Sequence, residues 1–383
     1  MNTKKYLIHI CCSYLVLFLL VSIVIAAPIA PTGLCVNDSN CGNSPNSASV
    51  AAPAAVHVNN FNPGYYIKGG ISYDKPMPDF VFKRIKNNPV FVGHKQGYTW
   101  RFLEPEEGVY DFSIIESDLA RLKAMDKRLW ITVVTKGRSY LPGTPSYMWN
   151  DSKYGCDPKY YSSYSSGVTG SGRIVCYWNE NVQIRYAALL EALGKRFNHE
   201  SHFEGLNLTE TSQNTTNAKN ANMGYTTEGF KQGFMKFALA AKKAFPDKTV
   251  LQMINFAPYD LPAFTAWAVE NGIGLGGPDV LLMSEKSLLH RVAYAQYPKY
   301  HDVVPTGIDV QWRNYDKYNL DIGRANTSEE LLLGAIEWLN PHYMFWEARD
   351  DDDGVRYFTD HAIPALNKHG PLPAAKAFYD SMQ

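Results

Sequence analysis

The stretch ENVQIRYAALLEALGKRFNHESHFEGLNLTE, residues 180–210, contains both of the periodicities on which the fold depends. Over residues 180–198 the apolar side chains fall on one face at helical spacing, which predicts an amphipathic helix. The residues of that face are Val182, Tyr186, Leu189, Leu190, Leu193 and Phe197. Residues 202–210 follow as a short predicted strand. A helix that leads directly into a strand is typical of the alternating units that build parallel sheets.

The same alternation continues on both sides of this stretch. Eight segments are predicted to be strands, and they span residues 64–72, 90–98, 128–135, 202–210, 249–256, 272–279, 303–311 and 341–347. The segment over 272–279 contains four glycines and is equally compatible with a loop. Further amphipathic helices are predicted over 227–245 and 328–339. Eight strands with intervening helices in residues 61–383 predict an α/β fold, a (β/α)8 TIM barrel.

An open, doubly wound sheet is the alternative architecture for such alternation. That fold normally places a glycine-rich phosphate-binding turn directly after its first strand. The sequence after residues 64–72 has no such turn, and the chain contains no Walker lysine motif. We therefore favour the closed barrel.

The N-terminus has the features of a secretory signal peptide. Two lysines precede an apolar run from Tyr6 to Ala27 that ends in small residues. We predict a signal peptide over residues 1–26 and an Asn/Ser/Ala/Pro-rich linker over 27–60. The alternative is an uncleaved membrane anchor, because the run is almost long enough to span a bilayer. Cleavage would give a protein that is secreted, periplasmic or held at the cell surface.

Cysteine usage agrees with export. After the predicted signal the chain has four cysteines, Cys35, Cys41, Cys156 and Cys176. An even number of cysteines in an exported protein predicts disulfide bonds. Their order favours the pairs Cys35–Cys41 and Cys156–Cys176, although three pairings are possible. The C-x-x-C pairs typical of zinc sites are absent from the sequence, so no metal is expected.

The charge balance excludes one class of partner. The chain has 37 Lys plus Arg and 37 Asp plus Glu, which gives a formal net charge of zero. Nucleic-acid binding depends on clustered excess cation, so we expect no nucleic-acid partner. No motif in the sequence requires a cofactor, and none is expected.

The candidate chemistry lies at strand ends. In a (β/α)8 barrel the reactive side chains gather at the carboxyl ends of the strands. Glu210, Asp309 and Glu347 are acids at the ends of predicted strands. Two carboxyl groups that face each other across a pocket are the minimum for cleaving a glycosidic bond. One must be protonated to assist the leaving group, and the other must be ionised. We therefore nominate these three acids as catalytic candidates.

Other side chains near the strand ends are candidates for holding a sugar. Trp346 would present its face to the apolar side of a sugar ring. Lys136 would grip an anionic sugar or, alternatively, pair with Glu210. The substrate-binding candidates are Trp100, Arg101, Lys136, Asn255, Gln311 and Trp346.

One block of the sequence resembles a known family. Residues 98–134 are similar to the region after the second strand in the barrel glycoside hydrolases of clan A, which include the β-galactosidase families. The shared pattern is a Trp, a Leu-Glu-Pro, a Gly and a Tyr-x-Phe. It is formed here by Trp100, Leu103, Glu104, Pro105, Gly108, Tyr110 and Phe112. Within this block we expect Glu104 to hold loop backbone rather than to react.

The resemblance implies roles for particular residues. The family's acid/base is a Glu at the end of the fourth strand, which corresponds to Glu210, and its eighth strand ends in a Trp, which corresponds to Trp346. Two positions depart from the family pattern. Thr209 replaces the usual Asn, and no Glu ends the seventh strand. The anionic partner would then be Asp309 or, failing that, Glu347.

The sequence thus predicts an exported glycoside hydrolase that acts on an oligo- or polysaccharide. A non-catalytic carbohydrate-binding or surface protein on the same barrel is the alternative, and the missing seventh-strand Glu is its best support. A barrel lyase or transglycosylase is equally compatible with the sequence. Two acids within about 10 Å of each other across the mouth would favour an enzyme.

Overall fold

The computed structural model describes most of the chain after the predicted linker. The described residues are 60–72, 75–138, 143–155, 172–173, 175–212, 224–282, 293–316, 318–319, 321–348, 350 and 355–381. The predicted signal peptide and Cys35, Cys41 and Cys156 lie outside them, so the signal and both disulfide pairs stay predictions. Within the described part of the chain, no helix is both long enough and apolar enough to cross a membrane.

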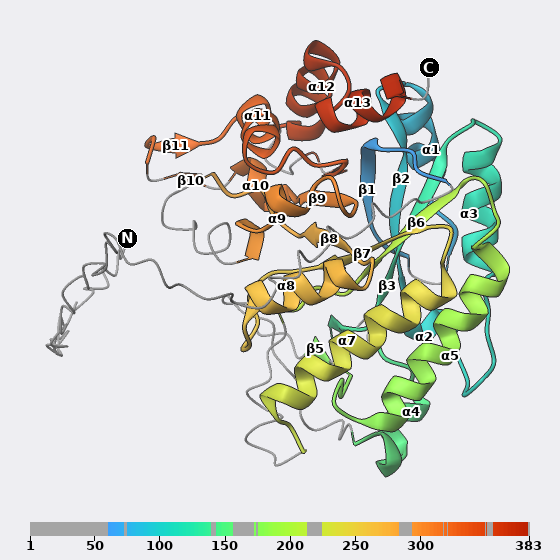
Figure 1. Ribbon diagram of the computed structural model, residues 1–383. Helices are drawn as coiled ribbons and strands as arrows, with labels where there is room; N and C mark the ends of the chain where they lie inside the picture. The colour runs from blue at the N-terminus through green and yellow to red at the C-terminus, as the bar shows by residue number, and fades with distance from the viewer. Residues whose placement is uncertain are drawn as a thin grey trace, which may run out of the picture. The chain divides into compact units, whose positions relative to one another are not determined.

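Eight parallel strands form a closed barrel in the order β1-β12-β9-β8-β7-β6-β3-β2 (Figure 1). They are β1 (Gly64–Ser72), β2 (Phe91–Thr99), β3 (Arg128–Val134), β6 (Phe203–Leu208), β7 (Thr249–Met253), β8 (Gly274–Gly277), β9 (Thr306–Val310) and β12 (Tyr343–Glu347). All eight predicted strands are confirmed, including the glycine-rich segment over 272–279. The first strand pairs with the last, with Gly64 opposite Tyr343, so an open sheet is excluded.

Helices surround the barrel (Figure 1). They are α1 (Asp79–Lys86), α2 (Trp100–Leu103), α3 (Ser113–Lys123), α4 (Tyr147–Asn150), α5 (Glu180–Phe197), α7 (Thr227–Ala244), α8 (Leu261–Glu270), α9 (Tyr297–Tyr300), α10 (Trp312–Asp316), α11 (Ser328–Leu339), α12 (Ile363–His369) and α13 (Pro373–Ser381). Two short ribbons, β4 (Gly137–Arg138) with β5 (Gly172–Arg173) and β10 (Tyr318–Asn319) with β11 (Arg324–Ala325), lie outside the barrel sheet.

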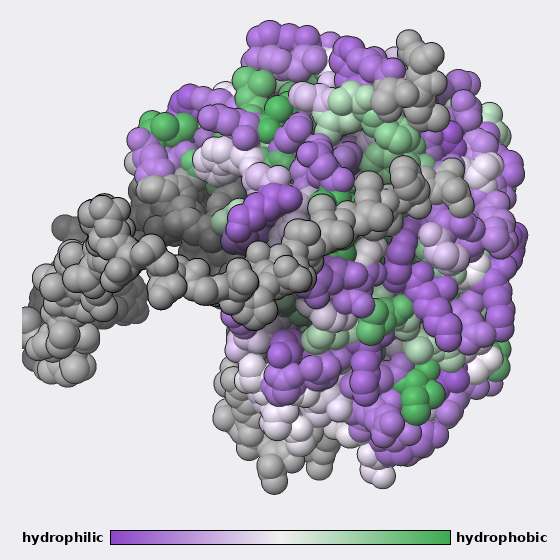
Figure 2. All heavy atoms as spheres, viewed as in Figure 1, coloured by the Kyte–Doolittle hydropathy of each residue, from purple (hydrophilic) through white to green (hydrophobic). Residues whose placement is uncertain are grey.

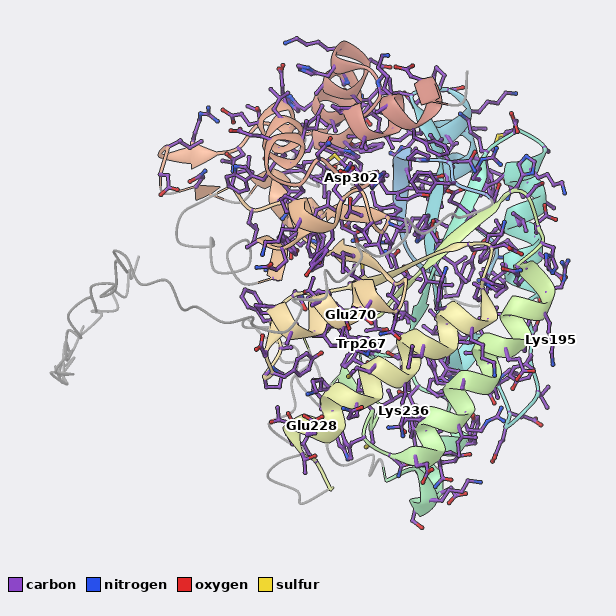
Figure 3. All side chains as sticks on the ribbon, viewed as in Figure 1. Lys195, Glu228, Lys236, Trp267, Glu270 and Asp302 are labelled. Atoms are coloured by element: carbon purple, nitrogen blue, oxygen red, sulfur yellow. The ribbon has the colours of Figure 1, made fainter. Side chains whose placement is uncertain are left out.

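The three predicted helices are α5, α7 and α11, and their apolar faces are the buried ones. Side-chain oxygens of Asn179, Thr226 and Thr327 cap their N-termini, because the first backbone N–H groups of a helix have no partner within it. The opposite faces are charged, as Lys195 on α5 and Glu228 on α7 show (Figure 3). Hydrophilic side chains accordingly cover most of the surface seen in Figure 2.

Aromatic rings fill the interior of the barrel. Tyr66, Trp130, Leu251, Tyr343 and Phe345 form a fully buried cluster there. Glycines on neighbouring strands make room for these rings. A Cβ at position 93 would lie 2.8 Å from the Tyr66 ring, and one at position 307 would lie 3.1 Å from Phe345. A barrel of this size cannot hold a large side chain from every strand, which explains why glycine is tolerated in its strands.

The Leu-Glu-Pro block has a structural role, as expected for Glu104. The Glu104 carboxylate is fully buried and accepts hydrogen bonds from the Trp100 indole, at 2.7 Å, and from the Gly108 backbone, at 2.9 Å. It also forms an ion pair with Arg185 of α5. These contacts fix the loop after β2 against the helical layer.

The contact between α5 and α7 can be tested at Gly194. A Cβ there would lie 2.2 Å from the backbone carbonyl oxygen of Ala244. Gly334 on α11 is a matched control, since the atoms nearest to an added Cβ belong to the Leu282 side chain, at 2.5 Å and beyond, which can rotate away. Both changes gain about 1 kcal/mol of helix propensity.

We expect Gly194→Ala to lower the free energy of unfolding by about 1–2 kcal/mol, because overpacking against backbone outweighs the gain in propensity. Gly334→Ala should leave the free energy of unfolding unchanged or raise it. Urea unfolding followed by circular dichroism measures both variants. Equal effects at the two glycines would contradict the close approach of α5 to α7.

Candidate active site

Four polar side chains occupy equivalent places at the carboxyl ends of neighbouring strands. Each lies two residues beyond the last residue of its strand, in the order β3, β6, β7 and β8 around the barrel. They are Lys136, Glu210, Asn255 and Asp279. Parallel strands in register bring such positions to the same rim, and this is the end at which barrel sites are built.

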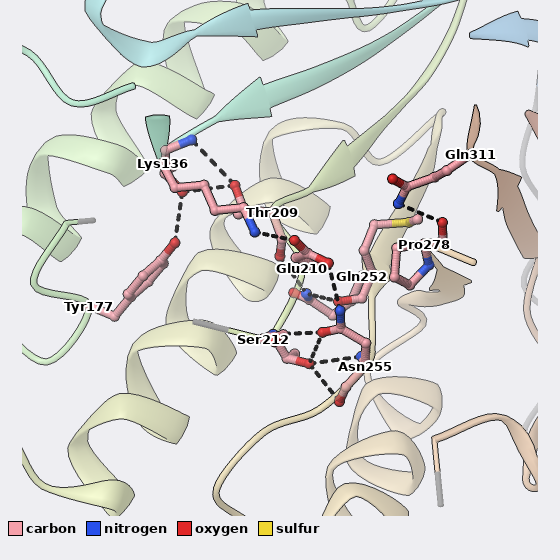
Figure 4. Close-up of polar contacts among 12 residues, drawn as sticks. Lys136, Tyr177, Thr209, Glu210, Ser212, Gln252, Asn255, Pro278 and Gln311 are labelled. Carbon is pink, nitrogen blue, oxygen red and sulfur yellow. Dashed lines mark hydrogen bonds and ion pairs between the residues drawn. The ribbon is translucent and has the colours of Figure 1, made fainter. Parts of the chain in front are cut away.

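Glu210 is at the centre of the polar contacts on this rim (Figure 4). The Lys136 ammonium forms an ion pair with Oε1, and the Asn255 amide donates to Oε2 at 2.6 Å. The Glu210 side chain is 16% exposed, so the carboxylate is held on both oxygens while part of the side chain contacts solvent. The structure therefore brings together three of the predicted site residues, Lys136, Glu210 and Asn255. Of the two roles predicted for Lys136, the structure shows the ion pair with Glu210.

The amide of Asn255 is itself fixed by the loop after β6. Its side-chain oxygen accepts from the Ser212 backbone N–H at 2.6 Å and from the Thr211 hydroxyl at 3.3 Å. With the oxygen engaged in this way, the NH₂ group faces Glu210. Asn255 is thus oriented as a donor to the carboxylate.

Thr209 does not face the rim. Its hydroxyl lies 2.8 Å from the Thr135 hydroxyl and donates to the Val133 carbonyl at 3.2 Å. The departure from the family pattern at this position therefore serves to hold the end of β6 against β3.

Asp309 is held by two lysines inside the mouth. Oδ1 accepts from the Lys95 ammonium at 2.6 Å, and Oδ2 forms an ion pair with Lys68 at 2.8 Å. The residue is only 4% exposed. Lys95 also lies 4.2 Å from the centre of the Phe345 ring, on top of the aromatic cluster.

The pKa values of the two lysines are shifted in opposite directions from the ordinary lysine value. Burial lowers the pKa of Lys95 to about 8, against the opposing effect of the Asp309 charge. Burial also acts to lower the pKa of Lys68, but Asp309 and Glu347 together raise it above its ordinary value. Lys68 therefore keeps its positive charge up to a higher pH than Lys95 does.

Glu347 lies at the edge of this cluster. It is 3.9 Å from the Lys68 ammonium and accepts a hydrogen bond of 3.3 Å from the Trp312 backbone N–H. Its side chain is 24% exposed, compared with 5% for that of Asp309. Of the two nominated partners for Glu210, Glu347 is thus the more accessible and Asp309 the more firmly held.

Asp279 is the acid that the sequence analysis missed. Its Oδ1 accepts a hydrogen bond of 3.1 Å from the side-chain amide of Asn314. Burial raises its pKa to about 6, with further contributions from the negative charges of Glu210 and Asp309. Asp279 is the last residue of the predicted strand over 272–279, so the reading of strand ends that gave Glu210 would also have found it.

Gln311 contacts a neighbouring loop, and Arg101 lies near the short helix α4. The Gln311 amide donates to the Pro278 carbonyl at 2.7 Å, which joins the loop after β9 to that after β8. The Arg101 guanidinium lies 5.9 Å from the centre of the Trp149 ring. Their roles as sugar ligands stay predictions.

The two predicted tryptophan contacts with a sugar require correction. Trp346 is fully buried in the layer between barrel and helices, where it stacks near Tyr315 with 6.2 Å between ring centres. Alternation along β12 turns Glu347 toward the mouth and Trp346 away from it. Trp100 is also fully buried and bonded to Glu104. Neither ring is exposed, so neither can stack against a sugar.

An exposed aromatic ring does follow Asn255. Phe256 is 48% exposed, although it lies directly after a residue that contacts Glu210. Within the described ranges, no group of three or more His, Cys, Asp or Glu side chains is arranged to hold a metal ion.

Lys95 leads to a prediction about stability and pH. Its pKa of about 8 in the folded protein is below the ordinary lysine value of 10.5, so between these values the unfolded chain binds more protons. The free energy of unfolding should therefore rise between about pH 8 and 10, with up to ~1.4 kcal/mol per pH unit from Lys95. Lys248, whose pKa burial also lowers to about 8, adds to the rise.

Lys95→Met should flatten this rise without abolishing it, as measured by urea unfolding at several pH values. Lys195→Met is the control, because it removes a lysine from an exposed ion pair and should leave the slope intact. An unchanged slope in Lys95→Met would contradict the assigned ionisation of the buried cluster.

Comparisons with known proteins identify the fold. No family model matches this sequence, and no curated protein sequence matches it. The catalytic domain of β-amylase from Paenibacillus polymyxa aligns with a TM-score of 0.56 and 11% identity over 83% of this chain and 99% of that one. A β-galactosidase from Bacillus circulans sp. alkalophilus aligns with a TM-score of 0.52 and 12% identity over 79% of this chain and 53% of that one. The chain shares the (β/α)8-barrel fold of these glycoside hydrolases.

Proposed function

We propose that this protein is a glycoside hydrolase that cleaves an O-glycosidic bond in an oligo- or polysaccharide. The observation that carries the proposal is the placement of Glu210, which lies at the carboxyl rim of the barrel between Lys136 and Asn255. The shared fold with glycoside hydrolases supports it, although fold alone does not determine function.

The chemistry explains why such a carboxyl group matters. Cleavage of a glycosidic bond needs one group that donates a proton to the leaving oxygen and one anion that attacks or activates water. An ionised carboxylate is an acceptor only. The donors Lys136 and Asn255 on its two oxygens therefore hold the Glu210 carboxylate in a fixed orientation.

Asp309 is better suited to positioning than to attack. Each of its oxygens already contacts an ammonium group, and the residue is almost fully buried. We assign it the role of fixing Lys68 and Lys95 at the mouth. Lys68 in turn lies beside Glu347, which we place at the rim as a contact for sugar hydroxyls.

We also propose that the protein is exported, because the N-terminal residues fit a signal peptide and the cysteines after it are even in number. Its site would then act on a carbohydrate outside the cytoplasm. No cofactor enters the proposed reaction.

A non-catalytic carbohydrate-binding protein is the second candidate. The observation that favours it is that two of the three nominated acids, Glu210 and Asp309, form ion pairs with lysines. Lys136 contacts Glu210, and two lysines contact Asp309. Such a protein would bind a sugar at the same mouth without cleaving it.

The test is hydrolysis of a panel of polysaccharides and aryl glycosides by the purified chain and by Glu210→Gln. We expect cleavage by the parent and at least a 100-fold loss of kcat/KM in the variant, because removing a catalytic carboxyl costs this much or more. Glu191→Gln, at an exposed glutamate on α5, is the matched control and should retain activity.

Three outcomes separate the candidates. Loss of activity in Glu210→Gln alone supports the hydrolase. Full activity in that variant contradicts the site. No cleavage of any substrate, together with oligosaccharide binding by calorimetry, favours the binding protein.

A further inference from the structure

The proposed hydrolase needs a proton donor besides Glu210, because both oxygens of Glu210 already accept from Lys136 and Asn255, and the seventh-strand position does not supply one. Asp309 occupies that strand end, where both of its oxygens contact lysine ammonium groups. Because both oxygens accept from ammonium groups and the residue is only 4% exposed, Asp309 is poorly placed to reach a substrate. The acid must therefore come from another strand end.

Asp279 has the required position. It lies two residues beyond β8, as Glu210 lies two residues beyond β6, and β7 alone separates these strands. The same offset places Asn255 between them after β7, and Asn255 contacts Glu210. Glu210 and Asp279 thus belong to one row of side chains along the rim.

The orientation of Asp279 is set by a buried amide. Asn314 of α10 is only 2% exposed, and its side-chain oxygen accepts from the backbone N–H groups of Gln311, at 2.8 Å, and Val280, at 3.3 Å. Its NH₂ group is therefore the part that faces Asp279, where it donates to Oδ1 at 3.1 Å. With Oδ1 accepting, Oδ2 is the oxygen on which Asp279 can carry a proton.

The surroundings of Asp279 favour its protonated form. Burial raises its pKa to about 6, and the negative charges of Glu210 and Asp309 raise it further, against the opposing effects of the Asn314 hydrogen bond and the Lys68 charge. The phenol of Tyr294, which is fully buried, also lies close to Asp279. A carboxyl group whose pKa is raised, on the same rim as a carboxylate held by two donors, is an arrangement suited to acid/base catalysis.

We propose that Asp279 is the catalytic acid that protonates the leaving oxygen while Glu210 acts as the anion, and that Asn314 is the positioning residue for Asp279. This inference rests on the proposed hydrolase function and adds the identity of its acid. It replaces the sequence-based assignment of the acid role to Glu210.

The proposed step breaks one glycosidic bond and consumes one molecule of water. The bond between the anomeric carbon and the glycosidic oxygen breaks, and its electron pair stays on that oxygen, which takes the proton from Asp279 Oδ2. The anomeric carbon then gains the hydroxyl of a water molecule, either directly or after attack by Glu210. The remaining proton of that water returns the carboxyl pair to its starting state, so one bond is hydrolysed without any oxidant or cofactor.

The first test compares leaving groups. Aryl glycosides of the sugar cleaved by the parent are prepared with phenol and with dinitrophenol, since only the poor leaving group needs a proton. We expect Asp279→Asn to lose at least 100-fold in kcat/KM on the phenyl glycoside and less than about 10-fold in kcat/KM on the dinitrophenyl glycoside. Asp302→Asn, at an exposed aspartate (Figure 3), is the control and should leave both rates unchanged.

The second test uses Asn314→Asp, which keeps the shape of the side chain and adds a negative charge next to Asp279. In the parent, kcat/KM should fall as pH rises through about 6, because Asp279 then loses its proton. The added charge should move this alkaline limb to higher pH, with a lower kcat and a similar KM. A purely structural role for Asn314 would leave the limb in place.

Each outcome is decisive. Equal loss on the two aryl glycosides, or no loss in Asp279→Asn, overturns the acid assignment, whereas Glu210→Gln would still be inactive if the hydrolase function is correct. If Asp279→Asn does not fold, the position of the alkaline limb in Asn314→Asp decides. A parent that cleaves no glycoside at all contradicts both the function and this inference.

Discussion

Pairing of β1 with β12 closes the barrel, and this closure determines what the interior and the mouth can contain. Successive side chains of each strand then point alternately inward and outward. On β12 this rule puts Tyr343 and Phe345 in the interior cluster, Glu347 at the mouth and Trp346 in the outer layer. The aromatic cluster fills the middle of the interior, and the polar groups of the mouth lie above it. Lys95 lies directly on Phe345 in that position, where it can be buried only because Asp309 supplies the opposite charge.

Most of the fold follows from local sequence patterns. Helical faces and short apolar runs are properties of neighbouring residues, which is why α11 has the predicted bounds and all eight barrel strands were found. The errors lie at strand ends. The segments predicted over 202–210, 249–256 and 272–279 end as strands at Leu208, Met253 and Gly277. Beyond these points the chain leaves the sheet, and Glu210, Asn255 and Asp279 lie in the residues that follow.

The site was only partly predictable, because its contacts join residues distant in sequence. Glu210, Lys136 and Asn255 were nominated individually from strand ends, and the structure shows that they meet. The pairing of Asp309 with Lys68 and Lys95 depends on the register of three strands, which no local pattern contains. The assignment of Trp346 failed for a related reason, since a shift of one residue along a strand reverses the side to which a ring points. Asp279 was overlooked because the glycines before it favoured a loop as strongly as a strand.

In our proposal, Asp279 is the proton donor and Glu210 the anion of one catalytic pair. A crystal structure of the Glu210→Gln variant with an uncleaved oligosaccharide tests it most directly. We expect a glycosidic oxygen within about 3 Å of an Asp279 carboxyl oxygen, with the anomeric carbon of the same bond facing residue 210. A bound sugar whose glycosidic oxygen is out of reach of Asp279 and instead contacts Glu347 or residue 210 would contradict it.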